Sequence, residues 1–539
     1  MAQAECGMRW SVVLLAACGA AANVLGQTGW SPVSREVERP FATVLQAYGS
    51  DAHTAIRPYA IGTLKATNMP DSLQPSSVLP KLDTWAGRLN GRKFRWGPLL
   101  EATGGYGSGT TSGTLYRTGG GFWADLDAGA KVNFHLDAFA ISERLPGYLD
   151  TLARATQVTP GEGYAYGSSP DVTHYDWNGH VSWDAHKYIN LTLGRGKNFF
   201  GEGYRSLFLS DEAYSYPYLR LSTTVWKIKY VNLFSMMNDI RGAKGVPSEY
   251  GRKFSSMHYL SWNASKRINL AVFEGIIWST GDEDYPRGFD LNYLNPVIFY
   301  RPVEYRIGSP DNALLGLGLN IKAGKHVLFY GQLMLDELLM DQVQRGDGWY
   351  ANKQAFQIGV NAYEAFGVAG LQLRGEWNFI RPFMYTHSDT RQNYAHMGQP
   401  LAHPYGSNLQ EAVAQGDLVR DRWVYAAHFS MAWMGSDNEF SYGNNIFRPE
   451  SDRPKLPDNK PDDFGYRIGK LHQINLFHAE LRAGWTVDPR SATRLEAAYT
   501  LRVRTPSEGD GTVTNYLRLG LVCHFRDRHP EQEVRYELK

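Results

Sequence analysis

The chain has 539 residues, and 55 Lys and Arg oppose 54 Asp and Glu, so the formal net charge is +1. This balance argues against a protein that binds nucleic acid through a basic excess. Hydrophobic residues make up 43% and charged residues 20%, which excludes a disordered chain. Aromatic residues reach 13% and there are 55 Gly, so the composition favours a large antiparallel β structure over an α/β enzyme.

The N-terminus has the features of an export signal. Arg9 precedes a short apolar run that continues through small residues to Ala22, so we predict a signal peptide over residues 1–26. Residues 15–18 (LAAC) also match the lipoprotein pattern, in which Cys18 is acylated, and the sequence leaves this alternative open. The apolar run is too short to span a bilayer, and no later stretch has 18 continuous apolar residues, so we expect no transmembrane helix.

The cysteines are few and badly placed for a disulfide or metal framework. Cys6 and Cys18 lie in the predicted signal peptide, which leaves Cys523 as the single thiol of the mature chain. A disulfide scaffold and a four-cysteine metal site are therefore excluded.

From about residue 96 to residue 525 the sequence alternates between apolar and polar residues with a period of two. We count roughly seventeen such runs, most of about 9–13 residues, which is the length of a tilted membrane-crossing strand. One run is typical of the rest, with Phe122, Ala124, Leu126 and Ala128 alternating with Trp123, Asp125 and Asp127. Such alternation predicts strands with one face towards lipid and the other towards a lumen.

Short breaks and long connections also alternate along the chain. The long connections that we predict cover residues 144–172, 238–256, 281–312, 381–421 and 435–470. This arrangement indicates an all-β fold, a transmembrane antiparallel outer-membrane β-barrel. Since single-chain barrels have even strand numbers, we favour about 18 strands, with a weak strand hidden near 207–210 or 440–447. A soluble propeller is the alternative, but we find no repeat of 40–50 residues.

The two ends of the barrel domain carry different segments. Residues 27–95 do not alternate, and they are predicted as a short, partly helical periplasmic or plug segment, with a short helix within 76–90. Residues 96–525 are predicted as the barrel. The last run ends at Phe525, which resembles the C-terminal strand signal of outer-membrane barrels, and a charged tail follows over 526–539.

No enzyme signature stands out. The sequence has no Gly-x-Ser-x-Gly elbow, phosphate loop, His-Glu-x-x-His or Cys-x-x-Cys pair, so we predict no enzymatic activity, no cofactor and no metal. His387, His396 and His403 share one long connection with Asp389. Loop histidines of this kind are more often solvated or hydrogen-bonded than metal-bound or catalytic.

Four polar motifs occupy connections and combine turn residues with aromatic rings and amides. They are GEGYRSL (201–207), LNYLNP (291–296), GSPDN (308–312) and QPLAHP (399–404). Loops of this composition can fold inward and close a lumen, and they also suit a carbohydrate surface. Plain turn chemistry is the competing interpretation.

Three longer stretches carry a resemblance. LGRGKNFFGEGYRSLFLSDEAYSYPYLRL from Leu193, FDLNYLNPVIFYRPVEYRIGSPDNALLGL from Phe289 and NYAHMGQPLAHPYGSNLQE from Asn393 resemble the Wzi-type capsule-assembly family. They resemble most its gliding-motility branch of RemB-like outer-membrane proteins, from about His53 to the last strand. The resemblance implies an eighteen-stranded barrel closed at its periplasmic end by N-terminal helices. It also implies a non-enzymatic role in retaining capsular polysaccharide, or in surface adhesion and gliding.

We therefore predict a protein of the cell outer membrane that binds lipid and a capsular or surface polysaccharide through its extracellular loops. The candidate polysaccharide contacts are Tyr204, Arg205, Tyr293, Arg306, Asp311, Asn312 and His403. One alternative is a gliding-motility or adhesion component that binds a protein partner. Another is a passive porin-like channel, whose lumen would be lined by charged residues such as Asp137, Arg374 and Arg494.

Overall fold

We describe a computed structural model of the chain, in which residues 29–66, 87–89, 92–109, 112–168, 170–243, 246–281, 288–298 and 311–528 are described. The predicted signal peptide with Cys18, most of the segment predicted to contain a short helix, and Arg306 lie outside these residues. In the part of the chain that is described, no helix has both the length and the apolar character needed to cross a bilayer.

Eighteen antiparallel strands close into a barrel, which confirms the predicted fold class and strand number. In chain order they are β3 (Arg92–Ser108), β4 (Gly113–Ala128), β5 (Val132–Arg144), β9 (Asp171–His186), β10 (Ile189–Gly196), β12 (Tyr216–Val225), β13 (Ile228–Asp239), β14 (Gly251–Asn263), β15 (Ile268–Ser279), β16 (Asn312–Ala323), β17 (Val327–Leu335), β18 (Gln354–Tyr363), β19 (Leu371–Ile380), β22 (Leu409–Arg420), β23 (Trp423–Gly435), β24 (Gln473–Asp488), β25 (Thr493–Pro506) and β26 (Thr512–Cys523).

The remaining elements are short. The helices are α2 (Arg35–Gln46), α3 (Ile61–Ala66), α4 (Gly147–Thr156) and α6 (Met340–Arg345), with single 3₁₀ turns η3 (Pro247–Glu249), η4 (Leu291–Leu294), η5 (Ala365–Gly367), η6 (Thr390–Gln392) and η7 (Glu450–Asp452). The short strands are β1 (Ile56–Arg57), β2 (Gly87–Leu89), β6 (Val158–Thr159), β7 (Gly163–Tyr164), β8 (Tyr166–Ser168), β11 (Phe199–Phe200), β20 (Ala395–His396) and β21 (Gln399–Pro400).

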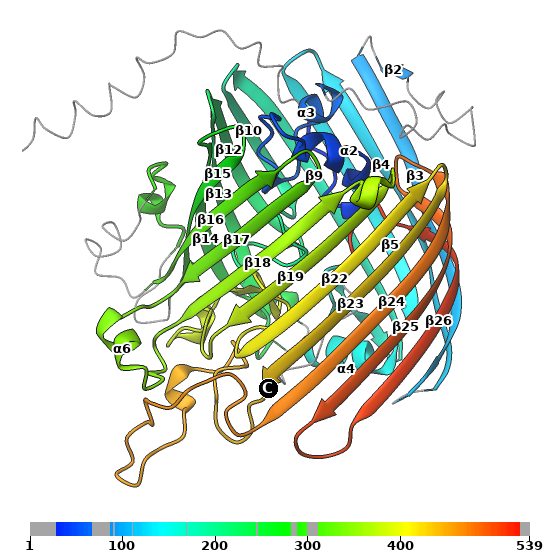
Figure 1. Ribbon diagram of the computed structural model, residues 1–539. Helices are drawn as coiled ribbons and strands as arrows, with labels where there is room; N and C mark the ends of the chain where they lie inside the picture. The colour runs from blue at the N-terminus through cyan, green and yellow to red at the C-terminus, as the bar shows by residue number, and fades with distance from the viewer. Residues whose placement is uncertain are drawn as a thin grey trace, which may run out of the picture.

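Each barrel strand pairs with its neighbours in sequence, and β26 pairs with β3 to close the sheet. Short turns such as 129–131 between β4 and β5 lie at one end (Figure 1). The described parts of the connections within 145–170, 197–215, 240–250, 280–311, 336–353, 381–408 and 436–472 lie at the other end, together with the short turn 507–511 between β25 and β26. In outer-membrane barrels short turns are periplasmic and long loops extracellular. A closed sheet leaves no backbone N–H or C=O group unpaired, which is what a segment needs to cross a bilayer. This fold therefore places the chain in the outer membrane.

The period-two pattern separates a lipid face from a lumen face, as predicted. On β26, Leu517 and Leu519 are 58% and 67% exposed on the outside, whereas Arg518 between them is 8% exposed inside the barrel. On β4, Phe122 is exposed and the neighbouring Trp123 and Asp125 are buried. The charged residues of the strands therefore face a lumen in which most of them have little contact with solvent.

The position predicted for the eighteenth strand is wrong. Neither 207–210 nor 440–447 forms a barrel strand; both are buried loops, and the Ser210 N–H donates to Leu401 O rather than to a wall strand. The strand that the prediction missed is β22, which lies inside the segment predicted as the connection 381–421. Its outward residues include Ala412, Ala414 and Gly416, which have too little apolar surface to produce a clear alternation.

The N-terminal segment lies in the periplasmic mouth of the barrel (Figure 1). Trp30 Nε1 donates to Thr192 Oγ1 of β10 at 2.8 Å, and Lys322 of β16 donates to Ser50 O at 2.9 Å. Ser34 caps α2 by accepting from Val37 N at 3.3 Å, which satisfies one of the free N–H groups at a helix start. Arg39 of α2 also pairs with Asp417 of β22, nine strands from β10 in the closed sheet, so residues from opposite walls hold this segment in the opening.

The main apolar core lies inside the barrel, between the wall and the connection 197–215. Phe208 of this connection is fully buried and stacks on Phe273 at 5.1 Å between ring centroids. Its ring fits against Gly316 of β16, where an added Cβ would lie 2.4 Å from Phe208 Cε1. Gly316 therefore provides the space that lets the connection pack on the wall.

We expect Gly316→Ala to push Phe208 off the wall and to lower stability by about 1–3 kcal/mol, the usual cost of overpacking. The measurement is the temperature at which the detergent-folded barrel loses its compact gel mobility. Gly375→Ala is the matched control, since its Cβ would meet only Val360 Cγ1 at 3.7 Å. Equal midpoints for the two variants would contradict this account of the Phe208 contact.

Candidate functional site

The motif at 201–207 lies deep in the lumen, in the connection between β10 and β12. The N–H groups of Tyr204 and Arg205 donate to the carboxylate of Glu376 on β19, at 2.8 and 3.1 Å. A Cβ at Gly203 would lie 2.4 Å from Glu376 Oε2, so glycine is needed for this close approach. The motif is therefore a plug that the barrel wall holds by its backbone.

Two of the candidate residues meet at one carboxylate, and a third packs on one of them. Arg205 donates from Nε and Nη2 to Glu411 at 3.1 and 2.8 Å, and from Nη1 to Glu212 at 3.0 Å. His403 Nε2 lies 2.8 Å from the same Glu411, and the Tyr204 ring packs 4.8 Å from the Arg205 guanidinium. Burial lowers the pKa of His403 despite the nearby carboxylate. Glu411 was missed because it lies on β22.

Three other candidates form a second buried group at the extracellular end of β15 and β16. Tyr293 Oη donates to Asp311 Oδ2 at 2.6 Å, and Asn312 Nδ2 donates to Gln392 O at 2.9 Å. The Tyr293 ring also packs on Trp278, with centroids 4.7 Å apart. All six described candidates are at most 8% exposed. They hold loops together, and direct contact of these residues with a polysaccharide stays a prediction.

The histidines of the connection 381–408 have separate partners. His396 Nδ1 accepts from Asn238 N at 3.0 Å, whereas His403 pairs with Glu411. These two side chains are buried and hydrogen-bonded, which fits the second of the two states expected from the sequence, solvated or hydrogen-bonded. Within the described residues, one group has the spacing of metal ligands, namely Glu143, Glu162 and His174. Arg117 already donates to both of its carboxylates at 2.8 Å, so a protein cation occupies this position.

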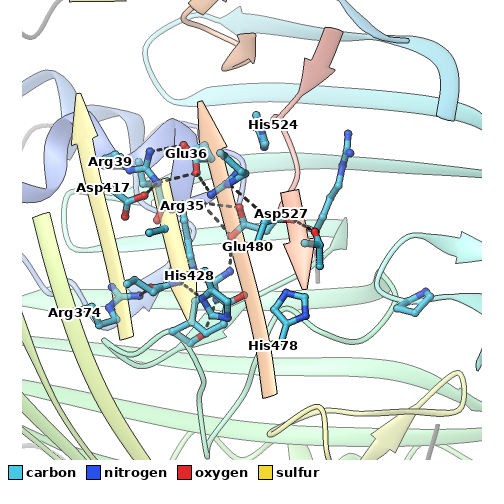
Figure 2. Close-up of a pocket in the computed structure, with 18 of the residues that line it drawn as sticks. Arg35, Glu36, Arg39, Arg374, Asp417, His428, His478, Glu480, His524 and Asp527 are labelled. Atoms are coloured by element: carbon cyan, nitrogen blue, oxygen red, sulfur yellow. Dashed lines mark hydrogen bonds and ion pairs between the residues drawn. The ribbon is translucent and has the colours of Figure 1, made fainter. Parts of the chain in front are cut away.

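A charged cavity remains between the plug and the N-terminal segment. It extends from α2 to α4 and the hairpin of β6 and β7. Figure 2 shows side chains of α2 facing His428 and His478, which lie on β23 and β24. The Tyr204 ring packs against the His428 ring at 4.7 Å, so the plug also forms part of the cavity wall.

Glu36 is the anchor of α2 in this cavity. Its carboxylate lies 2.6 Å from Arg39, 3.1 Å from Arg482 of β24 and 2.7 Å from Arg494 of β25. Burial acts to raise the pKa of Glu36, but the three arginines lower it well below its usual range. Glu38, two residues further along α2, has a pKa raised to about 8 by burial.

The C-terminal tail also enters the mouth. Arg35 of α2 pairs with Asp527 at 2.6 Å, and Ser34 Oγ donates to His524 O at 2.6 Å. Arg526 donates to Asp176 of β9 at 3.0 Å, and Arg528 pairs with Glu101 of β3. The first residues of the predicted tail, 526–528, thus fasten the seam where β26 meets β3, and residues 529–539 lie outside the described part.

The comparisons with known proteins show the fold. No protein-family model matches the sequence, and no curated protein matches it. Among solved structures, the chain resembles Wzi of Escherichia coli, an outer-membrane protein of group 1 capsule assembly described as a carbohydrate-binding β-barrel. This likeness has a TM-score of 0.52 and 14% identity, and it covers 92% of this chain and 99% of Wzi.

The porin OprD of Pseudomonas aeruginosa is also similar, with a TM-score of 0.42, 9% identity, and coverage of 83% of this chain and 97% of OprD. At 14% identity, the likeness to Wzi shows the outer-membrane barrel fold alone. The resemblance to the gliding branch stays a prediction.

We expect Arg205→Met to loosen the plug, because it leaves Glu411 as a buried charge without its guanidinium partner. Removal of one partner of a buried pair costs about 3–5 kcal/mol. The double variant Arg205→Met, Glu411→Gln removes both charges and is expected to recover part of this loss. Thermal midpoints of the folded protein measure the loss and its recovery. A double variant less stable than Arg205→Met would contradict the pairing of Arg205 with Glu411.

We expect acid to weaken the docking of α2 through Glu36. A carboxylate whose pKa is lowered by folding stabilises the protein above 4.5, its ordinary pKa, and this stabilisation is lost as the pH falls towards the folded value. Wild type should therefore exceed Glu36→Gln in thermal midpoint at pH 7, and the gap should narrow below pH 4.5. Exposed Glu439→Gln is the control, and a gap independent of pH would contradict this role.

Proposed function

We propose that this chain is a non-enzymatic outer-membrane barrel that binds a capsular or other surface polysaccharide at the cell surface. The observation that carries the proposal is the burial of two long extracellular connections, 197–215 and 381–408, inside the lumen, where Ser210 and Leu401 bond to each other and occupy space that an open pore would need. The overall likeness to Wzi supports it as a fold-level analogy.

The extracellular loops offer a surface with the chemistry that sugars need. Phe464 is 44% exposed, and the partly exposed rings of Trp349 and Tyr350 lie 5.7 Å apart. Lys470, also partly exposed, supplies a positive charge close to Phe464, whose carbonyl oxygen accepts from Lys470 Nζ at 3.3 Å. Exposed rings can stack on the C–H face of a sugar, and nearby charged groups bond its hydroxyls. Repeated weak contacts along one polymer then add up to avidity.

The buried candidates take an indirect role in this proposal. Arg205 and His403 hold the plug on Glu411, and Tyr293 with Asp311 holds the loop that follows β15. These contacts fix the loop ends that carry the exposed surface. Their replacement is expected to weaken polysaccharide binding only as far as it disorders the loops.

We expect Phe464→Ala to weaken binding of surface polysaccharide from the source organism about 2- to 10-fold, the worth of one aromatic contact. Calorimetry or glycan pull-down with detergent-folded protein measures it. Phe366→Ala is the matched control, because Phe366 is 90% exposed in a periplasmic turn at the opposite end of the barrel.

Absence of saturable binding by folded wild-type protein would contradict the proposal. Co-purification of a surface protein would then favour the adhesion or motility role. Steady single-channel current in planar bilayers would favour the passive channel, for which the polar lumen cavity is the supporting observation.

A further inference from the structure

One arginine of the lumen cavity differs from the others in its partners. The other cavity arginines each pair with a carboxylate, as Arg35 does with Asp527, Arg39 with Asp417 and Arg482 with Glu36. Among the described residues, Arg374 of β19 has no carboxylate within ion-pair distance. Its guanidinium donates to Asn361 Oδ1 at 2.7 Å, to Gln415 Oε1 at 3.2 Å and to Glu202 O at 3.5 Å.

These bonds leave part of the guanidinium available. An arginine has five N–H donors, and the three bonds use one each from Nε, Nη1 and Nη2. Asp417 pairs with Arg39 at 2.9 Å, and Glu376, two residues along β19, accepts from the plug backbone and from Tyr330 Oη at 2.8 Å. Neither carboxylate lies within ion-pair distance of Arg374, so its guanidinium reaches the cavity wall without a directly paired counter-charge.

Neutral polar groups surround this charge. Gln415 Nε2 lies 3.0 Å from His428 Nδ1, and the His428 ring packs against the Tyr204 ring. Asn361, Gln415, His428 and Tyr204 all line the same cavity as Arg374. In Figure 2, Arg374 and His428 lie below α2, near Asp417 and Arg39. Amides and a phenol ring beside an arginine suit a ligand that carries hydroxyl groups as well as a negative charge.

We propose that the lumen cavity binds a sugar acid, with Arg374 as the residue that receives its carboxylate. The planar guanidinium matches a carboxylate, and a charge-assisted hydrogen bond is stronger than a neutral one. Asn361, Gln415 and His428 bond the ring hydroxyls, and Tyr204 contacts the C–H face. The proposal rests on the proposed polysaccharide binding only in its choice of a sugar as the bearer of the carboxylate.

The test uses full-length protein folded in detergent, with glucuronate, glucose and acetate as probes in calorimetry. We expect saturable binding of glucuronate, at least about tenfold weaker binding of glucose and acetate, and weakening of glucuronate binding by added salt. Arg374→Gln should weaken glucuronate binding at least about tenfold, because the charge is lost while polar contacts to Asn361 and Gln415 remain possible. Arg420→Gln, an exposed arginine at the end of β22, should leave binding unchanged.

Three results would overturn the inference. The first is equal glucuronate binding by wild type and by an Arg374→Gln protein with the compact gel mobility of a folded barrel. The second is acetate binding as tight as glucuronate binding, which identifies a general anion site. The third is glucose binding as tight as glucuronate binding, which removes the need for a carboxylate. If Arg374→Gln does not fold, Gln415→Ala replaces it, with an expected loss of at least about threefold.

The polymer assay separates this inference from the proposed function. Polysaccharide binding that persists in wild type while glucuronate binding is absent would overturn the lumen site and leave the proposed function standing. Glucuronate binding that depends on Arg374, without any polymer binding, would support the lumen site and contradict the surface role.

Discussion

Charge pairing inside a desolvated lumen is the constraint on which the structure depends. A closed sheet in lipid must turn its polar side chains inward, because the outer face meets hydrocarbon. An eighteen-strand barrel is too wide for wall side chains to fill and pair across it. Glu376 and Glu411 therefore take their donors from the plug that folds in between β10 and β12, through two N–H groups and the Arg205 guanidinium.

The same constraint ties the two ends of the chain to the closing seam. Glu36 of α2 draws Arg482 and Arg494 from neighbouring strands into one group, and Arg35 holds Asp527 behind β26. Arg528 pairs with Glu101 of β3, the strand that β26 must meet to close the sheet. Residues that close the periplasmic mouth thus also stabilise the junction between the first and last strands.

The sequence predicts the wall far better than the contents of the lumen. Alternation reports which face each strand residue takes, so the fold class and the outward Leu517 and Leu519 follow from it. It fails on β22, whose outward face is built of Ala and Gly. The motif around Arg205 was recognisable as special, but charged loop residues look alike whether they face water or a buried carboxylate. The pairing of Arg205 with Glu411, 206 positions apart, has no local signal.

An arginine without a carboxylate partner stands out in a lumen where most arginines have one. A guanidinium that is partly removed from water without a counter-charge loses hydration that neutral acceptors replace only in part. In a cavity whose other arginines, such as Arg39 and Arg482, each lie against a carboxylate, the amide partners of Arg374 leave its guanidinium able to receive an incoming negative charge. The ion pairs that hold α2 in the barrel therefore leave one arginine of this cavity that a ligand can pair with.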